Sequence, residues 1–101
     1  MKSEAFIVQD RLYLRFEPPG YGHVLELPVI QTGSRKKSNA WTWNGSLDNP
    51  TLKPSIRTVH GQDGQISHFW LNDGICKFLN DSTDGNAGKE IPLIDLKEGK
   101  E

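Results

Sequence analysis

The chain has 101 residues, 35% of them hydrophobic, and this length permits one hydrophobic core but not two. Twelve Lys and Arg against thirteen Asp and Glu leave a formal net charge of -1, which excludes the strong positive field of a general nucleic-acid or membrane binder. The single cysteine, Cys76, excludes an intrachain disulfide and is compatible with a reducing cytoplasm. Without a secretion signal or a long apolar run, we expect a soluble cytoplasmic protein with no membrane partner.

The first third of the chain is predicted to form three strands. Residues 6–8 and 12–16 alternate between apolar and polar side chains and indicate an N-terminal hairpin. Residues 18–22 contain two prolines and two glycines and favour a turn, after which residues 23–30 resume an extended pattern. Because Pro28 has no N–H to donate to a neighbouring strand, we expect this third strand at the edge of the sheet.

The middle of the chain combines a basic loop with two tryptophans. Residues 31–39 are polar and basic, as is typical of a solvated loop. Trp41 and Trp43 are predicted to share one side of a short strand that ends in a turn at Asn44. Residues 50–54 begin and end with proline and are therefore expected to be extended.

The strongest local prediction is a hairpin that joins residues 66–71 to residues 75–79 through Asn72, Asp73 and Gly74. Both segments carry apolar residues on both faces, which favours central strands covered on two sides. Residues 55–60 are expected to pair with the first of them, so that a three-stranded meander results.

The C-terminal part is predicted to contain a polar loop at residues 80–88, with at most one helical turn near Ala87, and a last strand at residues 91–96. Residues 97–101 are a charged tail. The sequence therefore predicts a mainly β fold, in which residues 1–96 form a small single-domain antiparallel sheet. A sandwich and an open barrel built from hairpins both remain compatible with the pattern.

The candidate metal ligands are the three histidines and the cysteine, which are the softest ligands in the chain. None of them lies in a recognised spacing such as C-x-x-C or H-E-x-x-H. A zinc site can still be assembled from His23, His68 and Asp84 if folding brings them together. The alternative is three scattered histidines and a buried cysteine, with no cofactor.

Nucleophilic catalysis has little support in the sequence. Ser67 and His68 are adjacent, but neighbouring side chains on a strand point to opposite faces and cannot contact each other. There is no G-x-S-x-G motif, and Asp81 and Asp84 lack the ligand spacing of a calcium loop. We therefore expect a protein that is not an enzyme, with no catalytic residues.

A basic and aromatic cluster provides the candidate ligand-binding residues. Cationic side chains followed by exposed aromatic rings are what single-stranded nucleic acid or a nucleotide would use, through phosphate contacts and base stacking. The alternative is a solvated loop followed by core tryptophans. The residues concerned are Arg35, Lys36, Lys37, Trp41 and Trp43.

Residues 41–56, WTWNGSLDNPTLKPSI, resemble the signature W-x-W-N-G-x-L-x-x-P-T-x-x-P-S-I. This signature belongs to a family of short proteins of unknown function, which is common in phages and prophages and is often mislabelled as ammonia monooxygenase. The resemblance continues through residues 68–74 and 82–88 and covers about residues 12–94.

The resemblance also implies a zinc-stapled β domain, and this chain departs from that pattern at the implied ligands. Ser67 and Ser82 stand where relatives carry Cys, and Asp84 stands where they carry His. Near residues 18–23 the C-x-x-C pair of the relatives is absent and only His23 remains.

We therefore expect a small, non-enzymatic phage or prophage accessory protein that binds a host protein in the bacterial cytoplasm, for example to inhibit a host defence system. It would act as a monomer or a homodimer. One alternative is a nucleotide-sequestering or nucleic-acid-binding module that uses the basic loop and the tryptophans. A second is a degenerate zinc-stapled structural domain with residual zinc.

Overall fold

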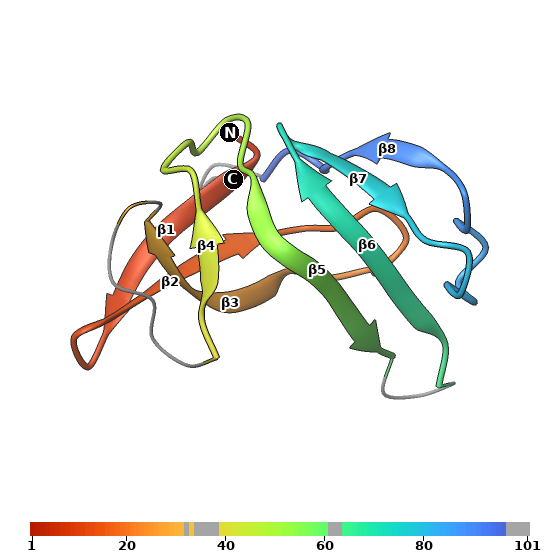
Figure 1. Ribbon diagram of the computed structural model, residues 1–101, viewed down its shortest axis with the longest axis horizontal. Coiled ribbons are helices and arrows are strands. Elements are labelled where there is room, and N and C mark those ends of the chain that lie inside the picture. Colours follow the sequence, from red (N-terminus) through yellow and green to blue (C-terminus); the bar gives the residue numbers. More distant parts are fainter. Residues whose placement is uncertain (32, 34–38, 61–63, 97–101) are drawn as a thin grey trace.

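One curled sheet of eight strands makes up the computed structural model, which describes residues 1–31, 33, 39–60 and 64–96 (Figure 1). The strands lie in the sheet in the same order as in the chain, and the sheet curls into a half-barrel. No helix occurs in these ranges. The prediction of a mainly β fold built from hairpins is confirmed. The strands are β1 (Ser3–Val8), β2 (Arg11–Phe16), β3 (Leu25–Gln31), β4 (Trp41–Trp43), β5 (Leu52–Val59), β6 (Ile66–Asn72), β7 (Ile75–Phe78) and β8 (Glu90–Pro92).

The N-terminal hairpin forms as the alternation predicts. β1 and β2 pair antiparallel up to Val8 and Arg11, which leaves Gln9 and Asp10 as a two-residue turn. Both turn residues have positive φ, 50° for Gln9 and 65° for Asp10, as in the type I′ turns that match the twist of a hairpin. This part of the fold is encoded locally.

The prediction that Pro28 marks an edge strand is wrong, because β3 lies between β2 and β4. Leu25 to Pro28 pair antiparallel with β2, whereas Val29 to Gln31 pair in parallel with β4. The proline therefore stands where the strand changes partner, which is a point where a missing N–H is tolerated. The same exchange makes one pair of neighbouring strands parallel in an otherwise antiparallel sheet.

The meander predicted in the C-terminal half is present. β5, β6 and β7 pair antiparallel in succession, and the β6–β7 hairpin closes at Asn72 and Ile75. Asp73 and Gly74 form its turn with φ values of 54° and 78°. β8 adds to β7, and the chain then returns towards β2 through a bridge between Glu17 and Ile94.

The core fills the inner face of the curled sheet. Phe16 from β2 and Phe69 from β6 are fully buried, and each such side chain contributes roughly 1.5–3 kcal/mol of hydrophobic stabilisation. Because packed side chains occupy the inner face, any reactive site has to lie on the outer face or in the loops. The buried cluster comprises Leu14, Phe16, Leu27, Val29, Trp43, Leu52, Ile56, Phe69, Leu71, Cys76, Phe78 and Leu93.

Two predicted features lie outside the described residues: the basic side chains at 35–37 and the charged tail at 97–101. Within the described ranges, no helix has the length and apolar character needed to cross a membrane.

Candidate active site

Three polar side chains on the outer face of the sheet are joined in a line. The hydroxyl oxygen of Ser55 lies 3.2 Å from Nε2 of His68. On the other side of the same imidazole, Nδ1 lies 2.9 and 3.0 Å from the two carboxylate oxygens of Asp81. The histidine therefore bridges a serine and an aspartate through its two ring nitrogens.

The hydrogen-bonding capacities of the three groups fix the proton positions. An ionised carboxylate only accepts, so the proton of a neutral imidazole belongs on Nδ1, where it is donated to Asp81. The lone pair of Nε2 then faces the Ser55 hydroxyl and can accept its proton. This is the order of contacts that activates a serine nucleophile, with the carboxylate orienting the imidazole.

The alternation of β6 places His68 on the outer face. Its neighbours Ser67 and Phe69 are both buried, so the side chain between them points the opposite way. Arg57 of β5 lies directly across from His68 in the strand register. Ser55, two residues before Arg57, therefore shares its face and lies diagonally across from the histidine.

A bulge in β5 contains Ser55. The strand pairs with β6 at Leu52↔Leu71 and next at Ile56↔Phe69, so four residue steps in β5 oppose two in β6. Bulges of this kind bend a strand and redirect a side chain, and they are frequent beside active sites. The Trp41 indole also donates a hydrogen bond to the Ser55 carbonyl at 3.3 Å, which holds the bulge against β4.

The loop after β7 holds Asp81 by bonding to the backbone of β6. The Ser82 hydroxyl accepts the His68 N–H at 3.0 Å and donates to the His68 carbonyl at 2.9 Å. Thr83 bonds Ile66 through both its N–H, at 2.8 Å, and its hydroxyl, at 2.7 Å. The carboxylate is thus fixed relative to the histidine, although the Asp81 side chain is 61% exposed against 21% for His68.

A second serine, histidine and aspartate are joined in a different order at the inner face. The Ser67 hydroxyl donates a hydrogen bond to Asp84 at 2.5 Å. Nε2 of His60 lies 2.9 Å from the hydroxyl oxygen of Ser67. Here the serine is central, and its proton already goes to the carboxylate, so His60 has to donate to it. Ser67 is 1% exposed. This trio satisfies buried polar groups and cannot present a nucleophile to a substrate.

The structure separates the residues considered for a metal site. His68 faces outward with Asp81, whereas Asp84 bonds Ser67. His23 packs against Tyr21, with ring centroids 4.2 Å apart. Among the described residues, no group of three or more His, Cys, Asp or Glu side chains could hold a metal ion.

The tryptophans considered for base stacking act as framework. Trp43 is buried in the core cluster and donates its indole N–H to the Ser46 carbonyl at 3.0 Å. Trp41 is half-buried and donates to Ser55, as described above. Their three basic companions, Arg35, Lys36 and Lys37, lie outside the described residues.

Cys76 is not a rival nucleophile. Its side chain is buried in the core cluster, and burial raises the pKa of the thiol from 9.0 to about 12. The thiolate that a cysteine nucleophile requires is therefore absent near neutral pH.

Sequence reasoning considered Ser67 beside His68 and missed Ser55. The useful signal was the predicted pairing of residues 55–60 with 66–71, because its register places Ser55 and His68 on one face. Nothing in the sequence indicated that the loop after β7 would return Asp81 to the same histidine.

A family model described as "Bacterial ubiquitination-like system serine protease (BubE)" matches residues 1–79 of the chain. The match includes Ser55 and His68 and ends two residues before Asp81. Neither the curated proteins nor the solved structures gave a match.

This match corrects three expectations drawn from the sequence. A serine protease family contradicts the prediction that the protein is not an enzyme. It also contradicts the predicted role as a non-enzymatic phage accessory protein, because the family is placed in a bacterial ubiquitination-like system. The expected keywords of phage protein and host defence inhibitor are wrong for the same reason. The prediction failed because it searched for catalytic pairs along the sequence and not across neighbouring strands.

Proposed function

Since the chain belongs to the BubE family of bacterial ubiquitination-like system serine proteases, we propose that it is a serine peptidase whose nucleophile is Ser55. His68 is the general base and Asp81 orients the imidazole. The single observation that carries this assignment is the position of His68 between the other two side chains, with one ring nitrogen facing each of them.

The geometry supports a two-step acyl transfer. As Ser55 Oγ attacks the scissile carbonyl carbon, its proton passes to Nε2 of His68, and Asp81 stabilises the resulting imidazolium at Nδ1. His68 then donates that proton to the leaving amine, so that the C–N bond breaks and an ester to Ser55 remains. A water molecule, deprotonated by His68, attacks the ester and releases the carboxylic acid and the free serine.

The substrate we propose is a protein of the same ubiquitination-like system, because the family description assigns the protease to such a system. The placement of the site supports a polypeptide substrate. Ser55 and His68 are half-buried on the outer face of the sheet, so an extended peptide segment can be laid across them. Cleavage of a peptide or isopeptide bond requires the same acyl-transfer chemistry.

Covalent labelling tests the nucleophile without knowledge of the substrate. A small alkyl fluorophosphonate should form a bond between phosphorus and Ser55 Oγ and release fluoride, which intact-protein mass spectrometry detects as a single adduct. Peptide mapping should place that adduct on Ser55. Ser55→Ala should abolish it, whereas Ser67→Ala should retain it. An adduct on another serine, or no adduct on folded protein, would overturn the assignment.

A further inference from the structure

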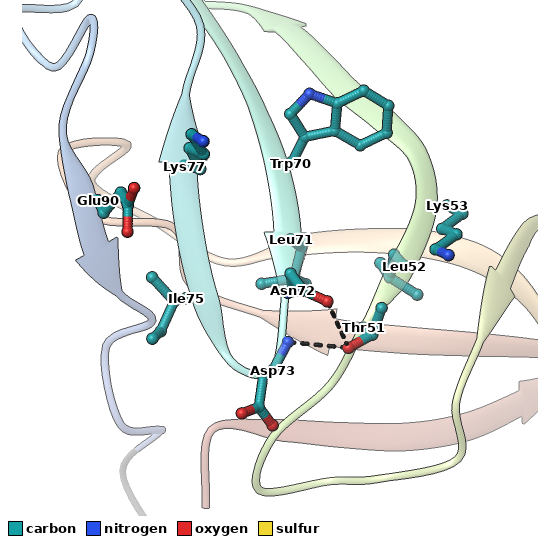
Figure 2. Close-up of a pocket in the computed structure, with 10 residues that line it drawn as sticks. All are labelled: Thr51, Leu52, Lys53, Trp70, Leu71, Asn72, Asp73, Ile75, Lys77 and Glu90. Atoms are coloured by element: carbon teal, nitrogen blue, oxygen red, sulfur yellow. Dashed lines mark hydrogen bonds between the residues drawn. The ribbon is translucent and has the colours of Figure 1, made fainter.

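A hollow of about 520 Å³ lies on the outer face of the meander (Figure 2). Strand alternation puts Ser55 and His68 on this same face. Residues from β5, β6, β7 and β8 line it, and the Trp70 indole stands at one end. The volume is within the range of sites that bind small molecules or side chains. The hydrolytic chemistry described above does not use this hollow.

The hollow lies next to the three proposed catalytic side chains on the same face of the sheet. Trp70 follows His68 by two residues on β6 and therefore shares its face, about 7 Å further along the strand. Lys53, also in the lining, precedes Ser55 by two residues on β5. A peptide whose scissile carbonyl lies at Ser55 would reach the hollow with a residue one or two positions away, since an extended chain advances about 3.3 Å per residue.

Two large apolar side chains are exposed at this place. Trp70 is 42% exposed and Ile75 is 41% exposed, and both line the hollow. Leu52 and Leu71 also line the hollow, but their side chains belong to the buried core on the inner face, so the apolar side chains exposed to the hollow are those of Trp70 and Ile75. Apolar surface gathered in a depression, and rimmed by polar groups, is characteristic of a binding site.

The charges of the lining balance. Lys53 and Lys77 are opposed by Asp73 and Glu90, and Lys77 lies directly across from Glu90 in the strand register. A rim with two charges of each sign gives no net preference for an anionic or a cationic occupant. The selective feature that remains is the apolar surface of Trp70 and Ile75.

We propose that this hollow is a specificity subsite that binds a neutral apolar side chain, such as Leu or Phe, of the peptide substrate, close to the bond that Ser55 cleaves. This inference rests on the proposed peptidase function and names the substrate feature that the site selects. Trp70 supplies the face on which the side chain packs, and Ile75 closes the opposite wall.

Internally quenched octapeptides test the subsite. Leu, Phe, Ser, Asp and Lys are scanned in turn through three positions on each side of the cleaved bond. Wild-type protein should prefer Leu and Phe over the polar residues by roughly tenfold or more at one position, one or two residues from that bond. Trp70→Ala should lose this preference, mainly through a higher KM for the Leu peptide.

Matched variants separate a subsite from a folding effect. Ile7→Ala removes another exposed apolar side chain, on β1 and outside the hollow, and should keep the wild-type preference. Trp70→Phe should retain most of it. If Trp70→Ala unfolds, the Phe variant and Ile75→Ala supply the comparison. Thermal unfolding of each variant identifies any loss that is due to instability.

Two outcomes distinguish the inference from the function on which it rests. If the fluorophosphonate labels Ser55 equally in wild type and Trp70→Ala, and both show the same residue preference, the subsite is refuted while the peptidase assignment stands. If Ser55 is not labelled, the peptidase assignment fails. Binding of peptides that are cleaved slowly is measured by how strongly they protect Ser55 from labelling by the fluorophosphonate. If the Leu and Phe peptides give no protection, this result also counts against the subsite.

Discussion

The two serine–histidine–aspartate trios use the same three residue types on opposite faces of β6, yet only one of them has the arrangement of a catalytic site. In the outer trio His68 is central and the serine keeps its proton available to Nε2. In the inner trio Ser67 is central and buried, and its hydroxyl donates a hydrogen bond to Asp84. The order of hydrogen bonds and the access to solvent therefore decide the chemistry, and residue composition does not.

The largest expected effect is on the outer serine. Ser55→Ala should lower kcat for peptide cleavage by roughly 10⁴-fold or more, because the nucleophile is removed while the fold is retained. Ser67→Ala should instead keep kcat within a few-fold and lose about 1–3 kcal/mol of unfolding free energy, since His60 and Asp84 lose their shared partner. Steady-state kinetics and urea unfolding of both variants measure the contrast. The reverse pattern would make Ser67 the nucleophile.

The histidines should differ almost as strongly. His68→Ala should remove the general base and lower kcat/KM by a factor similar to that for Ser55→Ala, since residues that act as a unit give non-additive losses. The double variant should therefore be little worse than either single variant. His60→Ala should leave kcat/KM within a few-fold of wild type. Equal losses for the two histidines would mean that the outer and inner trios are not functionally distinct.

The aspartates should show a smaller contrast. Asp81→Asn should lower kcat by roughly 10- to 10³-fold, less than for a fully buried triad carboxylate, because solvent screens the exposed Asp81. Asp84→Asn should reduce stability and leave kcat nearly unchanged. Unfolding midpoints and kcat at one pH give both numbers. A rate for Asp81→Asn that equals wild type would remove Asp81 from the mechanism and leave a serine–histidine pair.

The smallest expected effect concerns Cys76, the buried thiol that belongs to neither trio. Burial raises the pKa of this thiol from 9.0, the value of an exposed thiol, to about 12 in the folded protein. Its stabilising contribution is therefore complete below pH 9 and is lost as the pH rises from 9 to 12. The unfolding free energy of wild type should fall with pH more steeply than that of Cys76→Ala between pH 9 and 10.5, by roughly 1 kcal/mol per pH unit.

All other ionisable groups are common to wild type and Cys76→Ala, so their contribution cancels in that comparison. Iodoacetamide at pH 8 should leave peptidase activity intact, which excludes the thiol as the nucleophile. Rapid alkylation of Cys76 in the folded protein would show that its burial is incomplete.

Local sequence patterns predicted most of the strands, and the reasons for the failures are tertiary. The Gln9–Asp10 turn and the β6–β7 hairpin follow from alternation, and Asp10, Asp73 and Gly74 are residue types that tolerate positive φ. Pro28 misled because β3 changes partner at that residue, and no local pattern reports which strands will become neighbours. The parallel pair of β3 and β4 was missed for the same reason.

The candidate site was less predictable, because each member depends on a different non-local feature. Ser55 requires the bulge in β5, and Asp81 requires a loop that bonds back to β6 through Ser82. Only the common face of Ser55 and His68 could have been derived, from the expected register of the meander. The pairing of the two strands was predicted, but the resulting contact between the Ser55 and His68 side chains was not.

The long motif at residues 41–56 gains a physical explanation from the structure. The Asn44 side-chain oxygen accepts N–H groups from Ser46 and Thr51, both at 3.1 Å, and the Ser46 hydroxyl accepts from Asn49 at 3.0 Å. These contacts set the path of the chain between β4 and β5, and Trp41 then holds Ser55 directly. The motif is thus a scaffold that ends at the proposed nucleophile.

The hydrogen bonds that join His68 to Ser55 and to Asp81 each span 13 residues of sequence. The three proposed catalytic residues therefore come from one contiguous stretch, residues 55–81, which runs from within β5 through β6 and β7 to the start of the following loop. Contacts of such short range close small loops and lose little chain entropy when they form. One meander therefore carries all three proposed catalytic side chains, while β1 to β4 complete the core behind it.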